Sequence, residues 1–210
     1  GTDHAYLPVY LMKEKKILSA VAGDIHYGPY KTAYNFVRNN NMDNSIDVRI
    51  GDGLTILNPG ETDVLVIAGM GGATIVKILA SCPEVVKCFR IMIFQPMVAA
   101  NLLRSWLVVN GWKICIEHLV SEDGKLYEII VVQKGANEEL TPLMAEIGPR
   151  LWEDKPLLIF EHLQQLLNKK RRIIAQMEEG SFARHTDKYK IYLNDIKQLE
   201  AMICQLPIAK

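Results

Sequence analysis

The sequence predicts an α/β domain whose mostly parallel sheet ends in an antiparallel β-hairpin, followed by a small α-helical domain. Up to about residue 134, short apolar runs alternate with amphipathic helical patterns, which is typical of a parallel α/β sheet. The last two strand patterns are separated only by residues 121–125, too few for a crossover helix, so they must form a hairpin. From Pro149 on, strand patterns stop and apolar residues recur at helical spacing. We therefore expect a sheet domain at 1–134, a linker at 135–148 and a helical domain at 149–210.

Each expected strand is a short apolar run, and each expected helix carries apolar residues on one face. The strands are expected at 17–23, 46–50, 63–68, 90–94, 112–120 and 126–133. The helices are expected at 29–41, 73–80, 99–110, 155–179 and 189–204. Gly111 directly follows the third helix, where a glycine is a typical C-terminal signal. The last two helices are both amphipathic and consecutive, which predicts an antiparallel, coiled-coil-like pair.

Composition excludes several classes of protein. The chain has 210 residues, of which 49% are hydrophobic and 23% charged, ordinary values for a globular domain that buries a core. No apolar run approaches the roughly 18 residues that span a bilayer, so we expect no membrane anchor. The four cysteines form no CxxC pair and the five histidines are scattered, so we expect no metal site. Reduced cysteines are typical of a cytoplasmic protein, and we expect a cytoplasmic monomer.

Charge is distributed unevenly along the chain. Residues 1–148 contain 13 basic and 16 acidic side chains, a net charge of −3, whereas residues 149–210 contain 11 and 8, a net charge of +3. The tail includes the run Lys169-Lys170-Arg171-Arg172. A basic segment on a mildly acidic body favours an anionic partner. The alternative is that the run is simply the solvated face of a helix.

The opening "GTDHAYLP" indicates where a ligand would bind. In a doubly wound sheet the ligand lies at the carboxyl ends of the strands, beside a glycine-rich loop that leads from the first strand into a helix. Gly1 and its neighbours fit the second half of such a loop, so we expect the first strand to lie upstream of Gly1. Asp3 would repel a phosphate, which disfavours a pyrophosphate ligand. It suits a cationic ligand, and this favours S-adenosylmethionine, with its sulfonium and ammonium groups, over NAD.

The next strand ends carry matching groups. Asp24 lies 21 positions after Asp3, where a carboxylate can accept both ribose hydroxyls. Asp52, in "GDG", can accept from the adenine amino group, while Gly53 lets the backbone bend around the base. The "AGMGG" turn at 68–72 would pass close to the methionyl end. A GDG is also a common turn and an acidic residue after a strand is often a cap, so the prediction of a methyltransferase-like fold depends on the order of the four loops.

Several motifs in series resemble one family. They are "GTDHAYLP", "AGDI..GPY..A", "RIGDGL", "VIAGMGG..I..IL", "QPM....LR.WL" and "DGKLYEI". Together they resemble the bacterial tRNA (adenine-22-N1)-methyltransferase family, often called TrmK, over nearly all of residues 1–134. The resemblance implies a Rossmann-like, class I S-adenosylmethionine-dependent methyltransferase domain, followed by a helical domain that helps to hold tRNA.

The resemblance also implies site residues. Those expected to bind the cofactor are Gly1, Asp3, His4, Asp24, Ile25, Asp52, Gly53, Ala68, Gly69, Met70 and Gly71. The sequence departs from the family at Met97, where many members have asparagine after "QP". Gln95 and the Pro96 carbonyl could still accept from the adenine amino group, so we expect both to be catalytic.

Methyl transfer to adenine N1 needs no general base, because N1 already carries a lone pair. Positioning should supply most of the acceleration, and the base must be flipped out of the tRNA fold. We expect Tyr6 and His4 to stack on the flipped base and Asp3 to take the amino proton of the cationic product. The basic run 169–172 would bind tRNA. Two alternatives stay open: a methyltransferase for a protein or small molecule, and an RNA-binding protein on an inactive methyltransferase fold, which Met97 favours.

Overall fold

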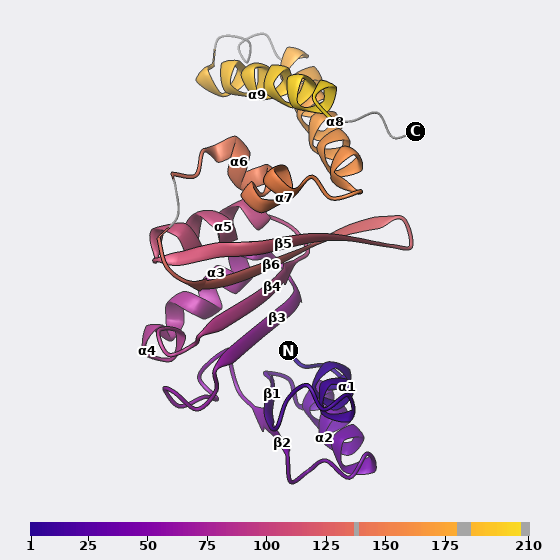
Figure 1. Ribbon diagram of the computed structural model, residues 1–210, viewed down its shortest axis with the longest axis vertical. Helices are drawn as coiled ribbons and strands as arrows, with labels where there is room; N and C mark the ends of the chain where they lie inside the picture. Colours follow the sequence, from indigo (N-terminus) through magenta and orange to yellow (C-terminus); the bar gives the residue numbers. More distant parts are fainter. Residues whose placement is uncertain (137–138, 180–185, 207–210) are drawn as a thin grey trace. The chain divides into compact units, whose positions relative to one another are not determined.

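The computed structural model describes residues 1–136, 139–179 and 186–206. The chain divides into two compact units, and Figure 1 follows the order of their elements along the chain. The first unit consists of residues 1–67 and 73–93, and the second of residues 68–72 and 94–210.

The first unit contains a pair of parallel strands covered by helices. Strands β1 (Ala20–Asp24) and β2 (Ile46–Ile50) pair in parallel, with Asp24 opposite Ile50. Helix α2 (Tyr27–Asn39) packs against both strands, and α1 (Tyr6–Lys13) follows the opening loop. The small apolar core of this part consists of Ala5, Val9, Ala22, Ala33, Val37 and Ile46. Parallel pairing therefore brings the carboxyl ends of β1 and β2 to one edge.

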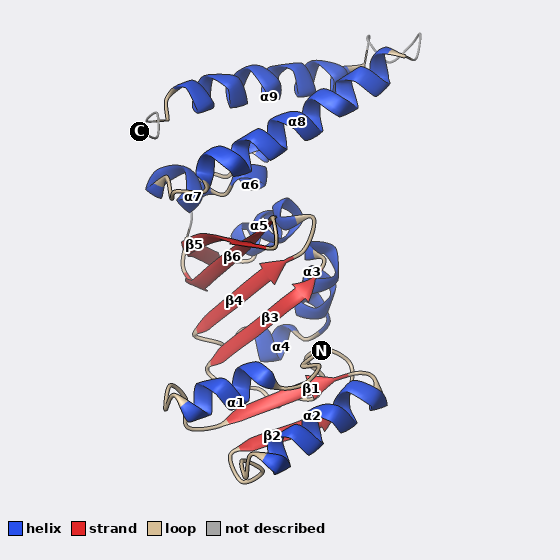
Figure 2. Cartoon of the chain, turned by 90° about the vertical axis from the view of Figure 1, so that its right-hand side faces the viewer, coloured by secondary structure: helices blue, strands red, loops and turns tan. Residues whose placement is uncertain are grey.

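The next elements have the alternating apolar texture that the sequence predicts. They are β3 (Val64–Met70), α3 (Gly72–Ser81), the short α4 (Pro83–Val86) and β4 (Ile91–Pro96). The four-stranded sheet has the order β3-β4-β6-β5, so the second strand of the last hairpin lies beside β4 and the first strand forms the edge. Figure 2 draws β3 and β4 in the same direction. The mixed sheet with an antiparallel end agrees with the expected fold class.

The terminal hairpin is longer, and its turn tighter, than the sequence indicated. Strands β5 (Trp112–Glu122) and β6 (Lys125–Lys134) are antiparallel and leave only Asp123 and Gly124 between them. Both turn residues have positive φ, 50° and 71°, as a two-residue type I′ turn requires. The expected five-residue link is therefore wrong, because ladder pairing continues to Glu122 and Lys125.

The second unit also contains the helical part of the chain. Its helices are α5 (Ala100–Val109), α6 (Pro142–Ile147), α7 (Pro149–Asp154), α8 (Ile159–Glu178) and α9 (Asp187–Cys204). Helices α8 and α9 pack against each other, as Figure 2 shows, and share an apolar core with α6 and α7. The segment expected as a plain linker contains α6, because Leu143, Ala145 and Ile147 are buried.

A buried ion cluster joins the hairpin to the helices of the second unit. Arg104 on α5 is fully buried, and its Nε lies 2.6 Å from Glu117 Oε1 on β5. Its guanidinium also pairs with Glu128 on β6 and donates to the carbonyl oxygen of Ala145, at 2.9 Å. Burial disfavours the charged form, but the attraction of the two carboxylates outweighs it and raises the pKa of Arg104. The cluster therefore fixes α5, β5, β6 and α6 against one another.

Within the described ranges, no helix is both long and apolar enough to cross a membrane.

Candidate active site

The opening loop folds closely over the end of β1. The Thr2 amide donates to the Gly23 carbonyl oxygen at 2.7 Å. A Cβ atom on Gly1 would lie 2.0 Å from Asp24 Oδ2, so only glycine permits this approach. The loop of "GTDHAYLP" and the carboxylate of Asp24 therefore form one local structure.

Asp24 is a buried carboxylate whose oxygens can accept further hydrogen bonds. The residue is only 6% exposed to solvent. Oδ1 accepts from the His26 amide at 3.0 Å, and Oδ2 lies 3.4 Å from the Asp3 amide. A carboxylate has about four acceptor directions, so about two remain, the number that a vicinal diol needs. Asp24 could therefore accept both hydroxyls of a ribose, and this role stays a prediction.

The backbone of the opening loop is in an uncommon conformation. Asp3 and Ala5, neither of them glycine, have φ of 53° and 56°, in the left-handed region. The Asp3 side chain is 73% exposed and its Oδ2 lies 3.0 Å from His4 Nδ1. Such conformations often mark functional loops, because surrounding contacts must hold them in place.

His4 and Tyr6 stack on one another. Their ring centroids are 5.0 Å apart with an interplanar angle of 11°, and Tyr6 meets Phe36 edge-on at 4.9 Å. We expected both rings to stack on a flipped base. Because each ring covers one face of the other, a base could stack only on an outer face of this pair. The two rings would therefore not enclose a base between them.

The loop after β2 lies against the end of β1. The Gly51 amide donates to the Asp24 carbonyl oxygen at 2.9 Å, and Gly53 has φ of 54°. A Cβ on Gly51 would lie 2.4 Å from Ile56, so the turn is tightly packed. Asp52 and Ile25 are both exposed. The predicted ribose and adenine contacts are thus neighbours in the first unit, and their roles toward a cofactor stay predictions.

In the second unit, the glycine turn after β3 is fastened to the end of β4. The Gly69 amide donates to Gln95 Oε1 at 2.8 Å, the Met97 amide to the Met70 carbonyl at 2.8 Å, and the Gly72 amide to the Val98 carbonyl at 2.8 Å. A Cβ on Gly72 would meet the Ala99 carbonyl oxygen at 2.2 Å. The turn that contains Ala68, Gly69, Met70 and Gly71 is therefore held by backbone hydrogen bonds and by one side chain.

These bonds change the interpretation of Gln95. We expected its amide oxygen to accept from the adenine amino group, but that oxygen already accepts from Gly69. Its Nε2 lies 3.4 Å from Met97 Sδ. Gln95 thus orients the glycine turn in this structure. Pro96 is buried at the end of β4, and Met97 is half exposed.

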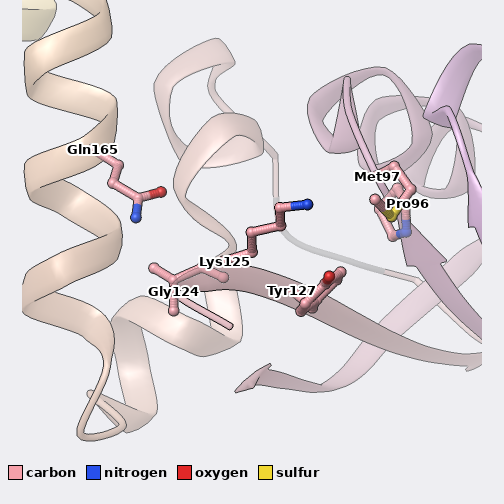
Figure 3. Close-up of a pocket in the computed structure, with 7 residues that line it drawn as sticks. Pro96, Met97, Gly124, Lys125, Tyr127 and Gln165 are labelled. Atoms are coloured by element: carbon pink, nitrogen blue, oxygen red, sulfur yellow. The ribbon is translucent and has the colours of Figure 1, made fainter. Parts of the chain in front are cut away.

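A cavity of about 290 Å³ lies beside Pro96 and Met97 (Figure 3). Its other walls come from the hairpin turn, the start of β6, and α8. The residues on these walls are Gly124, Lys125, Leu126, Tyr127 and Gln165. Sequence reasoning assigned none of them a role. The motif "DGKLYEI", which contributes to the family resemblance, contains Lys125 and Tyr127.

The basic run on α8 does not act as one surface. Lys170 is 2% exposed, and its Nζ lies 2.9 Å from both Glu146 Oε1 and Asp195 Oδ2. Burial disfavours the ammonium, but hydrogen bonds to Asp195 and Glu146 outweigh it and raise the pKa of Lys170. In this structure the ammonium of Lys170 is therefore paired inside the helical core and is not exposed at the surface of α8.

The other three cations of the run lie at the surface. Arg171 pairs with Glu200 on α9 at 2.7 Å. Lys169 and Arg172 form no ion pair within the part of the chain that the structure describes. Two of the four predicted tRNA contacts thus keep a free charge.

Metal-type ligands do not cluster in the described residues, where no group of three or more His, Cys, Asp or Glu side chains could hold an ion. All four cysteines are free thiols.

The sheet, its antiparallel end and the glycine-rich and acidic turns at the strand ends define a Rossmann-like methyltransferase of class I. A family model described as tRNA (adenine(22)-N(1))-methyltransferase matches residues 1–201. The chain therefore belongs to the tRNA (adenine(22)-N(1))-methyltransferase family, and the resemblance found in the sequence is confirmed.

Individual relatives agree with this assignment. The tRNA (adenine(22)-N(1))-methyltransferase of Bacillus subtilis (strain 168) is 34% identical over 187 residues, which are 86% of this chain and 78% of the relative. The crystal structure of the B. subtilis m1A22 tRNA methyltransferase TrmK matches with a TM-score of 0.87 at 30% identity, covering 97% of this chain and 89% of that one. A Streptococcus pneumoniae structure in complex with S-adenosyl-L-methionine matches with a TM-score of 0.84 at 29% identity and the same coverage.

Proposed function

We propose that this chain transfers the methyl group of S-adenosylmethionine to N1 of adenine 22 in tRNA. The family match over residues 1–201 carries the proposal, because it names both the reaction and the atom modified. A relative solved with S-adenosyl-L-methionine supports the cofactor. The predicted enzyme class thus follows from family membership. The geometry of the chain supports roles for its residues in binding the cofactor and positioning the substrate.

The acidic edge of the first unit fits the cofactor's nucleoside. Asp24 has about two acceptor directions left for the ribose diol, and Gly1 allows the loop to approach it. Asp52 is exposed for the adenine amino group, and the exposed side chain of Ile25 offers apolar surface to the ring. When bound, the cofactor supplies a methyl group on a positively charged sulfur. Asp3 favours that charge.

The remaining task of the chain is positioning. A bond forms between adenine N1 and the methyl carbon as the carbon–sulfur bond breaks, and the positive charge moves to the adenine ring. Well-aligned reactants gain effective molarities of about 10⁵–10⁸ M, so a rigid site matters more than a base. The glycine turn locked to Gln95 and Met97 supplies rigidity. Asp3, exposed beside His4, is our expected acceptor of the amino proton of the product.

The basic surface of α8 suits a polyanionic substrate. Lys169 and Arg172 are exposed and can contact tRNA phosphates. We expect the enzyme to act as a monomer and in the cytoplasm.

The test is a methylation assay with labelled S-adenosylmethionine and an unmodified tRNA, compared with the same tRNA carrying guanine at position 22. Label should enter the adenine-22 tRNA as 1-methyladenosine and not the guanine variant. Equal labelling of both tRNAs would contradict the target position. Labelling of protein or small molecules, but not of tRNA, would support the alternative methyltransferase. Cofactor binding without any transfer would support an RNA-binding protein on an inactive fold.

A further inference from the structure

We propose that the cavity beside Pro96 and Met97 holds the flipped adenosine, and that Tyr127, Lys125 and Gln165 are its contacts. The inference rests on the proposed function and assigns the acceptor site of that reaction to specific residues. It also gives α8 a direct part in substrate recognition.

The cavity is small, and one of its lining residues, Met97, is hydrogen-bonded to the glycine turn. Its volume of about 290 Å³ is just below the range for small-molecule sites, roughly 300–1,000 Å³. It is walled by the end of β4, the β5–β6 turn and α8, all in the second unit (Figure 3). Pro96 and Met97 continue from Gln95, which holds the glycine turn. A base seated here would lie beside the turn where the sequence predicts methyl transfer.

Tyr127 provides an aromatic surface that the fold holds in place. It is partly buried, and its hydroxyl has no hydrogen-bond partner among the described residues. Its neighbour Glu128 is paired with the fully buried Arg104. Successive side chains on a strand point to opposite faces, so pinning Glu128 directs Tyr127 to the face away from Arg104. A ring fixed in this way can stack on a nucleobase at little entropic cost.

Lys125 supplies a free positive charge at the rim. It follows the two-residue turn directly, and it forms no ion pair within the described ranges. Glu122, opposite it across the ladder, and Asp123 are acidic, yet neither forms a salt bridge with its ammonium. Because the tight turn fixes the backbone, the lysine can reach the phosphate of a nucleotide in the cavity without ordering a loop.

Gln165 supplies a group that discriminates between purines. Its Nε2 donates to Glu161 Oε1 at 3.3 Å on the same helix, which leaves Oε1 as an acceptor. Figure 3 shows this oxygen directed toward the side where Lys125 lies. An amide oxygen accepts from the amino group of adenine and repels the O6 atom of guanine. Gln165 therefore favours adenine as the base.

The test compares Tyr127→Leu with Tyr127→Phe in the full chain, by steady-state methylation of tRNA. Losing a stacking ring should lower kcat/KM for tRNA by about tenfold to a hundredfold, while phenylalanine retains most of it. The affinity for S-adenosylhomocysteine, measured by calorimetry, should not change. Gln165→Leu should narrow the difference in affinity between adenine-22 and guanine-22 tRNA.

For Lys125, the variant is Lys125→Gln, with Lys113→Gln as its control on the same hairpin. Loss of one phosphate contact should reduce the salt slope of tRNA binding by about 0.7–0.9, and the control should leave it unchanged. A tRNA with 8-azidoadenosine at position 22 should cross-link to residues 123–128. This cross-link decides the matter if Tyr127→Leu does not fold.

The outcomes separate this inference from the proposed function. A wild-type chain that fails to methylate tRNA would overturn the function itself. If the wild type is active and a folded Tyr127→Leu protein is equally active, the acceptor assignment is wrong. Weakened S-adenosylhomocysteine binding with unchanged tRNA kinetics would also overturn it, since the cavity would then serve the cofactor. A cross-link elsewhere in the chain would contradict it independently.

Discussion

Asp24 combines burial with incomplete hydrogen bonding. A buried carboxylate normally fills its acceptor directions, because a charge taken from water must be compensated. Here two backbone amides compensate part of the charge, and Gly1 leaves Oδ2 accessible to the loop. The incomplete set of partners is what a ligand with two hydroxyls would complete. Asp24 is therefore the residue whose replacement tests the cofactor site.

The Asp24→Asn variant should bind S-adenosylhomocysteine about tenfold to a hundredfold more weakly, because hydrogen bonds to a charged group contribute roughly 1.5–3 kcal/mol. Titration calorimetry measures the change, and a melting curve checks that the protein is folded. Asp43→Asn, an exposed aspartate in the same unit, is the matched control and should bind normally. Unchanged affinity in Asp24→Asn would remove the ribose assignment.

Single residues also show where sequence reasoning reached its limit. The run Lys169–Arg172 suggested four equivalent surface cations. Helical spacing places Lys170 in line with Leu163, Leu167 and Ile174, all of them buried, so the period contained the signal. What the period could not reveal was the pair of carboxylates, Glu146 and Asp195, that make a buried lysine tolerable. Those partners come from other helices and depend on tertiary packing.

At the scale of elements, the loop between β2 and β3 is held by Arg49. Its guanidinium pairs with Glu61 and Asp47 and donates to the Ile56 carbonyl at 2.7 Å. Hydrogen bonding from Arg49, and then from the Asn58 amide, lowers the pKa of Glu61 from 4.5 to about 2. Because the loop contains Asp52, this clamp keeps the predicted adenine contact in place.

The clamp predicts a specific dependence on pH. A carboxyl whose pKa is lower in the folded state stabilises the fold above its unfolded pKa, and this contribution is lost as pH falls through its folded pKa. For Glu61 the window therefore extends from about pH 4.5 down to about pH 2. Glu61→Gln should flatten the fall of stability in this window, measured by urea unfolding at several pH values. The effect should be small because the pair faces solvent, and an equal slope in both proteins would contradict it.

The strand elements were easier to predict than their connections. Apolar runs located the six strands found in the described residues, and the short link identified the hairpin. The turn itself was tighter than expected, because "EDGK" places Asp and Gly at the two positive-φ positions while the flanking residues pair. Helix α6 was missed because its six residues are too few to display a period. It forms because Leu143 and Ile147 bury against helices distant in sequence.

The stability of the α8–α9 pair depends on the buried charge of Lys170, which pairs with Asp195 on α9. Lys170→Met should destabilise the chain by about 3 kcal/mol, because it leaves two carboxylates without their cation. The neighbouring Lys169→Met, at the surface of the same helix, should change stability by less than about 0.5 kcal/mol. Chemical unfolding followed by circular dichroism distinguishes the two. Equal stability in both variants would mean that water replaces Lys170 at no cost.

At the scale of the molecule, the predicted functions divide between the two units. The first unit has the acidic strand ends that suit the cofactor's nucleoside, and the second has the locked glycine turn, the cavity and the basic helix. The sequence located the features that are formed by local motifs: the acidic strand ends, the glycine turn and the basic run. The cavity was not foreseen because its walls include Gln165 and Tyr127, which lie 38 positions apart in the sequence.

Recognition of tRNA by the whole molecule should depend on the free cations of α8 and not on the buried one. Neutralising both Lys169 and Arg172 with glutamine should lower the slope of log K against log salt by about 1.4–1.8, since each phosphate contact contributes about 0.7–0.9. Arg171→Gln should lower it less, because Glu200 already holds that guanidinium. Filter binding at several salt concentrations, with the S-adenosylhomocysteine affinity as an internal control, measures these slopes. An unchanged slope in the double variant would show that this face is merely solvated, and tRNA would then have to be held by the cavity and other surfaces.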